Sequence, residues 1–343
     1  MRSFLLSCLI FIPITIGASF SSAQSQASTK DFDVLRAYNG FVTLSPQREL
    51  YVKYSPPAPS MPTVILINGL TYSTRQWENF VGPLVAKGIG VLRFDPIGQG
   101  ETLLKYAPAL LPIQIEDQIE DLYNLLLKLN IKGPYNFVGL SYGGGLAAGF
   151  ATAYPKLVKN LVLMAPFTRP LEGTDNWIKA QIWATRQIFP NNKISDDELY
   201  DHFLHQIVYA TYPQAEPVIL ENPFKLEATF RLVQGIRKAR PIDWTHKIPK
   251  KALHLMVARQ DQYISVDVLD EYWDAVPEKA RASRIYINGS EHKMVEAVPN
   301  FTAYWVHQIL MGNAKLFKGL DYEGYPFLGE VRSGSETIKV GKE

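Results

Sequence analysis

Cysteine is almost absent from this chain, and its scarcity limits how the fold can be stabilised. The only cysteine among 343 residues is Cys8, which lies in an apolar N-terminal run. A single cysteine cannot form a disulfide within the chain, so stability must come from a buried core. Hydrophobic residues make up 47% of the sequence, which is enough for a large core in a chain of this length.

An excess of charge of one sign is also missing. The sequence has 35 Lys and Arg against 33 Asp and Glu, a formal net charge of +2, and no Lys/Arg-rich run. Proteins that bind nucleic acids usually present a basic cluster or stripe. We therefore expect no nucleic-acid partner. The length favours one large α/β domain with a subdomain over two equal domains.

The N-terminal residues form a segment of their own. A positive residue precedes the apolar run from Phe4 to Ile16, and small residues follow at Ser21-Ser22-Ala23. This order is typical of a secretory signal peptide. An uncleaved anchor is the alternative, but the run is shorter than the about 20 apolar residues that a span needs. We expect a signal peptide over residues 1–23, cleavage near Ala23-Gln24, a leader over 24–40, and a secreted or periplasmic protein without a stable membrane span.

After the leader, short apolar strands alternate with helical patterns. Thr63 to Ile67 is a continuous apolar run, as expected of a strand that is buried on both faces. Alternation at this spacing predicts an α/β fold whose central sheet is mostly parallel and covered by helices on both faces. The expected strands are 41–44, 49–54, 63–67, 90–94, 135–138, 160–164, 253–257 and 284–287, the last one. The expected helices are 75–87, 113–129, the stretch from the serine motif below to 154, 266–276 and 299–311.

The alternation is interrupted after the sixth strand. Residues 168–249 show helical patterns, loops and many aromatics, but no convincing strand. We interpret this segment as a helical cap inserted into a core made of residues 41–167 and 250–311. Residues 312–343 form a C-terminal extension, with a small hairpin around Tyr322 to Phe327 and no assigned role.

One motif carries the strongest chemical signal. Gly139-Leu140-Ser141-Tyr142-Gly143 follows an expected strand and opens an expected helix. A nucleophile at such a tight turn needs glycine on both sides, because a Cβ would clash across the turn, and the helix N-terminus favours developing negative charge. We therefore predict Ser141 as a nucleophile, with Gly139 and Gly143 as elbow glycines.

A serine hydroxyl needs a base, and the base needs an acid to orient it. His292 is the histidine in a loop after the last expected strand. His202 and His205 fall in the cap, His254 in a strand and His307 in a helix. Asp261 follows the strand before and can fix the imidazole tautomer, whereas its rivals Asp267 and Asp270 already lie in a helix. We predict a Ser141–His292–Asp261 triad, with no metal and no cofactor.

Backbone amides should stabilise the oxyanion. Tyr142, directly after the nucleophile, supplies one donor. The loop Asn68-Gly69-Leu70-Thr71 follows the third expected strand, and Leu70 is predicted to supply the second donor, with Gly69 allowing close approach of the backbone.

Together, these features resemble the α/β-hydrolase superfamily, in its capped branch of esterase-like, lactonase-like and aminopeptidase-like enzymes. The resemblance spans about residues 41–311. It includes Asp95-Pro96-Ile97-Gly98-Gln99-Gly100, which resembles the family's D-x-x-G-x-G loop. The family most often has His-Gly at the oxyanion loop, where this chain has Asn68-Gly69, so contacts of that side chain are expected to differ.

The resemblance implies a serine hydrolase that cleaves a carboxylic ester, thioester or lactone. An aminopeptidase-like amidase, an acyltransferase and a non-catalytic binding protein on the same fold are the alternatives. An amidase would need cap acids to hold a free amine, and candidates are Glu172, Asp175, Asp196, Asp197, Glu198 and Asp201. We expect a small-molecule substrate with an apolar portion. The cap aromatics, Trp177 and Trp183 among them, either line its pocket or pack the cap's own core.

Overall fold

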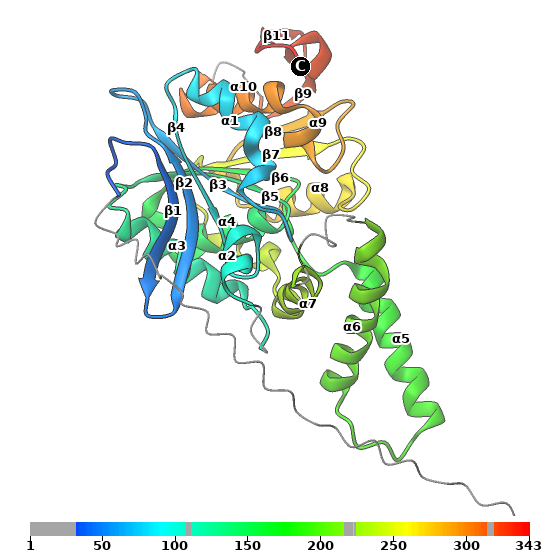
Figure 1. Cartoon of the computed structure of the whole chain (residues 1–343). Coiled ribbons are helices and arrows are strands. Elements are labelled where there is room, and N and C mark those ends of the chain that lie inside the picture. Colours follow the sequence, from blue (N-terminus) through cyan, green and yellow to red (C-terminus); the bar gives the residue numbers. More distant parts are fainter. Residues whose placement is uncertain (1–31, 108–110, 216–221, 223, 314–318) are drawn as a thin grey trace, which may run out of the picture.

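A computed structural model describes residues 32–107, 111–215, 222, 224–313 and 319–343 (Figure 1). The predicted signal peptide, its cleavage point and residues 24–31 of the predicted leader lie outside these residues. None of the helices in the described part of the chain is both long and apolar enough to cross a membrane.

The described residues form an eleven-stranded sheet at the centre of the molecule (Figure 1). Its order is β1-β2-β4-β3-β5-β6-β7-β8-β9-β10-β11, parallel from β4 through β9 and antiparallel at both ends. A mostly parallel sheet was expected, and this expectation is confirmed. The strands are β1 (Tyr38–Ser45), β2 (Arg48–Ser55), β3 (Thr63–Ile67), β4 (Gly90–Asp95), β5 (Tyr135–Leu140), β6 (Val158–Met164), β7 (Leu253–Ala258), β8 (Arg281–Ile287), β9 (Asp321–Tyr325), β10 (Glu330–Ser333) and β11 (Glu336–Lys339).

Burial along the strands explains this arrangement. Every residue of β4, β5 and β7 is buried, because helices cover both faces of the sheet centre. In β2 and β8, buried residues alternate with more accessible ones, as expected where one face is less covered. The helices are α1 (Glu78–Val85), α2 (Gly100–Lys105), α3 (Ile115–Lys128), α4 (Tyr142–Ala153), α5 (Glu172–Ile188), α6 (Asp196–Ala215), α7 (Lys225–Ile236), α8 (Val266–Ala275), α9 (Met294–Ala297) and α10 (Pro299–Leu310).

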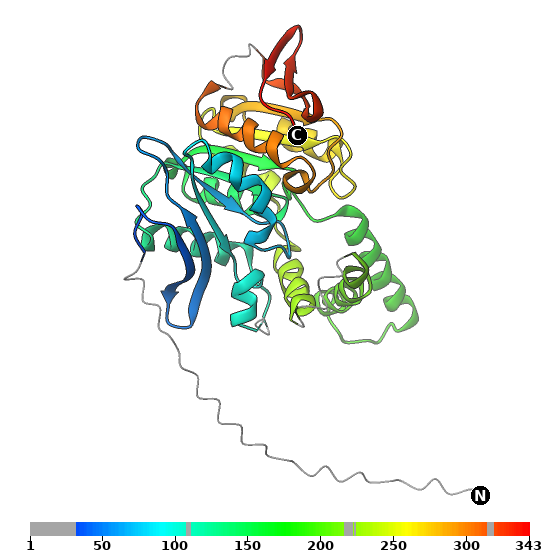
Figure 2. The same cartoon turned by 45° about the horizontal axis from the view of Figure 1, so that its top comes forward.

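Two groups of helices flank the sheet. Helix α1 packs on α9 and α10, while α3 packs on α4, and the views show these groups on opposite faces (Figures 1 and 2). The first predicted helix begins as a 3₁₀ turn over Thr74–Trp77 and ends at Val85. Strands β3, β5, β7 and β8 run in the same direction, so their carboxyl ends lie at the same edge of the sheet. The loops that follow them, although distant in sequence, meet at this edge.

The C-terminal extension corrects the expectation that Arg284 to Ile287 is the last strand. Strand β9 pairs in parallel with β8, with Ile285 opposite Tyr322, and β10 and β11 continue the sheet. These strands are short and mostly polar. In β9 only Tyr322 and Gly324 are buried, so the segment lacks the apolar run that marked the earlier strands.

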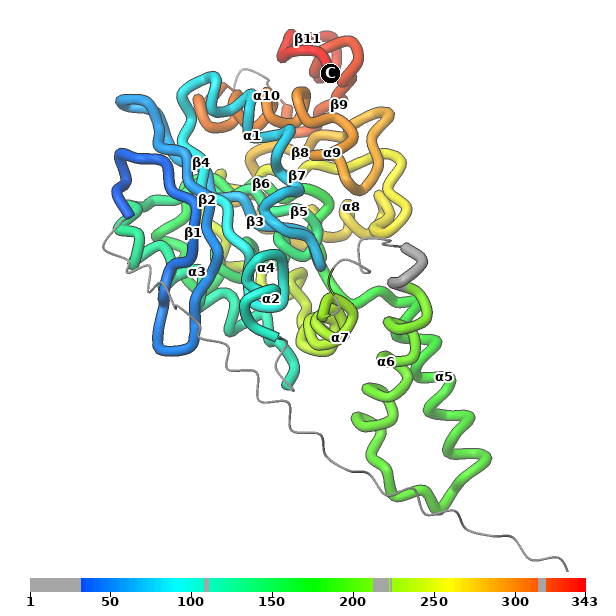
Figure 3. The backbone as a smooth tube through the Cα atoms, in the orientation of Figure 1, coloured from blue at the N-terminus to red at the C-terminus, as the bar shows by residue number. Residues whose placement is uncertain are grey.

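Helices α5, α6 and α7 lie between β6 and β7, where the cap was expected. Helices α5 and α6 pack on each other and project away from the sheet as a hairpin (Figure 3). This segment has a small core of its own, separate from the main one: Ile178, Ile182, Leu199, Leu204, Val208 and Phe230.

Candidate active site

Ser141 occupies a strained turn between β5 and α4. Its backbone has φ 53° and ψ −118°, a region that a residue with a side chain adopts only under constraint. The constraint comes from hydrogen bonds to the end of β6 and the loop after it. The Ser141 amide donates to Met164 O over 2.9 Å, and its carbonyl accepts from the Phe167 amide over 2.8 Å. The turn thus presents the serine above the strand end.

The two flanking glycines have no room for a side chain. A Cβ on Gly139 would lie 2.3 Å from Gly143 O, and a Cβ on Gly143 would lie 2.2 Å from Ile67 O. Both contacts are with backbone atoms, which cannot swing aside. The close approach of β3, β5 and α4 therefore depends on glycine at both positions.

His292 and Asp261 meet at the same edge of the sheet. Asp261 follows β7, His292 follows β8, and His292 Nδ1 lies 2.7 Å from Asp261 Oδ2. The other carboxylate oxygen accepts the amides of Tyr263 and Ile264, each over 2.8 Å, and the Asp261 side chain is fully buried. A carboxylate held this way can accept a hydrogen bond from Nδ1 and so fix the orientation of the imidazole.

The alternative histidines and acids lie elsewhere. His254 is buried within β7 and contacts Ser283 Oγ over 2.7 Å, while burial lowers the pKa of His307 in α10. Asp270 pairs with Arg284 over 2.9 Å. The rivals that sequence analysis considered, on both the base and the acid side, do not line the cavity that holds His292: His202, His205, His254, His307, Asp267 and Asp270.

The predicted oxyanion donors border the same space. Leu70 and Tyr142 both line the cavity with Ser141. Tyr142 is the first residue of α4, so its amide has no partner within the helix. Its hydroxyl donates to Gln118 Oε1 of α3 over 2.7 Å, and this hydrogen bond fixes the Tyr142 side chain. A Cβ on Gly69 would meet its nearest neighbours at 3.5 Å, so the fold alone does not require glycine there.

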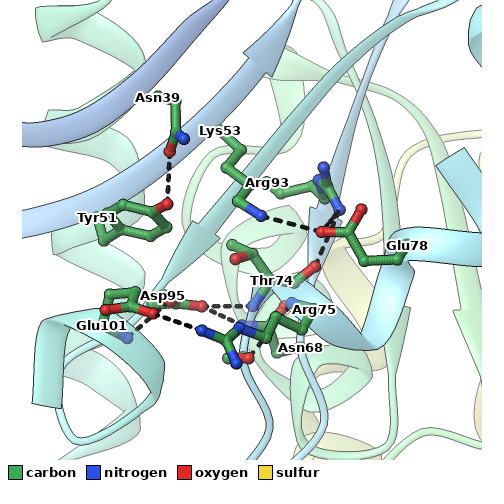
Figure 4. Close-up of polar contacts among 11 residues, drawn as sticks. Asn39, Tyr51, Lys53, Asn68, Thr74, Arg75, Glu78, Arg93, Asp95 and Glu101 are labelled. Carbon is green, nitrogen blue, oxygen red and sulfur yellow. Dashed lines mark hydrogen bonds and ion pairs between the residues drawn. The ribbon is translucent and has the colours of Figure 1, made fainter. Parts of the chain in front are cut away.

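Asn68 supports the predicted oxyanion loop from inside the protein (Figure 4). Its amide nitrogen donates to Phe94 O and to Asp95 Oδ1, each over 3.1 Å, and its oxygen accepts Trp77 Nε1 over 2.9 Å. The side chain is fully buried. At the position where the family most often has histidine, asparagine therefore connects this loop to the end of β4.

Asp95 is the centre of that buried network (Figure 4). Besides Asn68, its carboxylate accepts the Thr74 amide over 2.5 Å and the Glu101 amide over 2.9 Å. Burial raises the pKa of Asp95 to about 6, although these hydrogen bonds act in the opposite direction. Around this network, Glu78 pairs with Lys53 and Arg93.

A cavity of about 420 Å³ joins these residues to the cap. Its sheet side holds Ser141, His292 and the predicted oxyanion loop, and Tyr263 places its ring edge-on to His292 with centroids 5.2 Å apart. Most of its lining is apolar. The apolar residues that the cap segment contributes from α6 and α7 are Leu204, Ile207, Val208, Val233 and Ile236.

Neither of the two expected tryptophans borders this cavity. Trp177 is 43% exposed and Trp183 is 67% exposed, and neither belongs to the core of the cap segment. Trp183 is therefore at neither expected location, and Trp177 touches the cap's core only at its margin, through Phe203, with ring centroids 6.1 Å apart. Helical periodicity shows that residues share a face, but not whether that face meets a core or solvent. The lining residues Gln76, Tyr263 and Lys293 were not predicted either, because no sequence motif marks them.

Comparison with known proteins agrees with this architecture. Residues 58–296 match the family model described as serine aminopeptidase, S33. A 2-hydroxy-6-oxo-2,4-heptadienoate hydrolase from Pseudomonas putida is 29% identical over 144 residues, which are 41% of this chain and 50% of that protein. The chain thus matches about half the length of this curated relative.

Solved structures share the fold at low identity. An α/β hydrolase from a Medee basin deep-sea metagenome library has a TM-score of 0.59 and 19% identity, covering 82% of this chain and 99% of its own. The enol-lactonase of Burkholderia xenovorans LB400 has a TM-score of 0.54 and 20% identity, covering 78% and 99%. Because the family model matches most of this chain, residues 58–296, the chain belongs to the serine aminopeptidase, S33, family and is an α/β-hydrolase enzyme.

Proposed function

We propose that this hydrolase cleaves a carboxylic ester, thioester or lactone through an acyl-enzyme on Ser141. The observation that carries the proposal is the His292–Asp261 pair, 2.7 Å apart, beside the same cavity as a strained serine at a helix N-terminus. The order of Ser141, Asp261 and His292 along the chain is that of α/β hydrolases.

Each group has defined tasks in the proposed reaction. His292 Nε2 takes the Ser141 hydroxyl proton as the oxygen attacks the substrate carbonyl. The amides of Leu70 and Tyr142 bind the resulting oxyanion, and Asp261 stabilises the imidazolium. His292 then gives the proton to the leaving oxygen or sulfur, which departs. Water attacks the acyl-enzyme with the same base, releasing the acid and restoring Ser141.

The cavity supports a substrate with an apolar portion. Leu204, Ile207 and Val208 of α6 face the same space as Ser141, and burial of apolar surface there favours binding by about 25 cal/mol per Å². A lone ester carbonyl needs only the two oxyanion amides, so a mostly apolar lining suits an ester with a hydrocarbon acyl or alcohol part.

Cleavage of aminoacyl amides is the second candidate, because the matching family model is described as serine aminopeptidase. A free amine needs an available acid in the cavity. Of the acids considered from sequence, Asp175 lines the cavity, but it pairs with Lys179 over 2.5 Å and accepts Tyr200 Oη over 3.2 Å. The remaining cap acids have partners outside the lining or at its border: Glu172 with Arg169, Asp196 with Arg186, Asp197 with Lys238, Glu198 with Ser195, and Asp201 with Arg237.

A labelling experiment combined with a substrate panel tests the proposal. Purified protein is treated with a fluorophosphonate, digested and analysed by mass spectrometry, beside Ser141→Ala and the control Ser195→Ala. We expect labelling on Ser141, lost only in Ser141→Ala, with a fall in ester turnover on the order of 10⁴-fold. Turnover is measured on p-nitrophenyl esters, lactones and aminoacyl anilides. Absence of label at Ser141 would refute the mechanism, and faster cleavage of anilides than esters would favour the aminopeptidase.

A further inference from the structure

Lys293 places a positive charge beside the base. It directly follows His292, precedes the short helix α9, and lines the same cavity as Ser141. Its side chain is neither deeply buried nor freely exposed. No sequence pattern marks this residue, because a lysine in a loop is usually a solvated surface residue.

The Lys293 ammonium lies on an aromatic ring rather than in open solvent. Its Nζ is 4.9 Å from the centroid of the Tyr72 ring, and Tyr72 belongs to the loop that carries the proposed oxyanion donor Leu70. A cation over a ring is attracted to the π face, yet the ring satisfies only one side of the ammonium. Lysine has three N–H donors, so donors remain for a ligand.

The other charged residues of the lining are compensated by partners. Asp175 pairs with Lys179, and Arg237 lies 3.3 Å from Asp201 and 3.4 Å from Asp197. Among the residues that the structure describes, no carboxylate pairs with Lys293. Asp175 and Arg237 are thus balanced by their partners, whereas no ion pair within the described residues balances the charge of Lys293.

We propose that Lys293 forms an anion subsite, so that the preferred substrates carry a carboxylate or phosphate close to the scissile ester. This inference rests on the proposed function, because it assigns the substrate class of that same site. An ion pair in a mostly apolar cavity is stronger than one in water, and hydrogen bonds from an ammonium to an anionic oxygen are among the stronger ones. The same charge disfavours a substrate with a free amine, consistent with ester over aminoacyl amide cleavage.

Matched ester pairs test the subsite. Mono-4-nitrophenyl adipate and 4-nitrophenyl hexanoate differ in a carboxylate on the acyl part. The compounds 4-(hexanoyloxy)benzoate and its methyl ester differ in a carboxylate on the alcohol part. We measure kcat and KM for each on the parent enzyme, Lys293→Met and Lys293→Arg. The control is Lys87→Met, because Lys87 Nζ also lies over a tyrosine ring, 5.2 Å from the Tyr304 centroid, away from the cavity lining.

We expect Lys293→Met to lower kcat/KM about tenfold or more for the anionic member of at least one pair, mainly through KM. The neutral member of each pair should lose clearly less, and general misfolding would not produce such a change in selectivity. Lys293→Arg should retain the preference, and Lys87→Met should leave every ratio unchanged. The affected pair identifies which part of the substrate carries the anion.

Two results have separate meanings. If neutral esters are cleaved normally and Lys293→Met leaves both anionic-to-neutral ratios unchanged, the anion subsite is refuted while the proposed function stands. If no ester of either kind is cleaved and Ser141 is not labelled, the proposed function itself fails.

Discussion

His292 Nδ1 lies 2.7 Å from Asp261 Oδ2, and the remaining oxygen of Asp261 accepts two backbone amides. This carboxylate is therefore fixed by the turn after β7 before it orients the imidazole. The backbone of this turn, and not a flexible side chain, therefore sets the position of the carboxylate that pairs with His292. The relationship joins two loops that are 31 residues apart along the chain and adjacent only because β7 and β8 are neighbours.

Replacing Asp261 by Asn should lower ester turnover by about 10²- to 10⁴-fold, because an amide at this position favours the wrong tautomer of His292. Circular dichroism should show a folded protein, since Asn retains an oxygen to accept from the turn amides. The control is Asp267→Asn, which alters a carboxylate of the neighbouring helix and should leave kcat close to the parent value. A silent Asp261→Asn together with an inactive Asp267→Asn would contradict the assignment.

Adding a methyl group to either elbow glycine should disrupt the turn. Gly139→Ala and Gly143→Ala would place a Cβ within 2.3 Å of backbone oxygen atoms, so we expect each to lose at least about 3 kcal/mol of stability or fail to fold. Gly82→Ala is the matched control, because Gly82 lies inside α1 with no atom within 4 Å of an added Cβ. It should gain about 0.5–1 kcal/mol. Urea unfolding measures all three, and elbow variants of parent stability would contradict the packing argument.

The part of the fold that sequence could predict is the part with strong local signals. Strand β3 was placed at its observed bounds, because Thr63 to Ile67 is apolar on both faces. The elbow was recognisable because its backbone geometry demands glycine at fixed spacing. Strands β9 to β11 were not, since they are short, polar and stabilised by pairing with β8 across the chain.

The candidate site divides in the same way. Ser141, Asp261 and His292 follow strands, so their meeting at one sheet edge could be inferred from chain order. The place of Lys293 in the site depends on the direction of its side chain, which lies over the Tyr72 ring, and neither residue belongs to a motif. Contacts of this kind are set by tertiary packing, which local pattern does not record.

The buried carboxyl of Asp95 should make stability depend on pH in an unusual direction. Burial raises its pKa to about 6 from an unfolded value of 3.8, so the native state binds the proton more tightly than the unfolded state between these values. The resulting stabilisation is complete below about pH 4 and is lost as pH rises to about 6, by up to about 3 kcal/mol. Above about pH 6 this contribution no longer changes.

Asp95→Asn removes that titration. We expect the free energy of unfolding of the parent, minus that of the variant, to fall between pH 4 and pH 6.5 and then to level off. Denaturant melts at half-unit pH steps on both proteins measure this difference, which cancels the titration of other groups. Parallel pH profiles would show that Asp95 ionises normally in the native state.

The cavity walls, rather than the exposed tryptophans, should set the preferred chain length of the ester. Ile207 lines the cavity from α6, whereas Trp183 is 67% exposed and lies outside the lining. Ile207→Ala enlarges the space by about three methylene groups, each worth about 1–3 kcal/mol of discrimination, so the optimum should move to longer chains. Trp183→Ala should keep the parent profile, although it removes a larger side chain. Both variants should be labelled by fluorophosphonate at the parent rate, because the proposed triad lies on sheet loops and not on α5 or α6. The measurement is kcat/KM over p-nitrophenyl esters from acetate to laurate. A shifted optimum in Trp183→Ala with an unchanged one in Ile207→Ala would show that the substrate binds along the outer face of the hairpin instead.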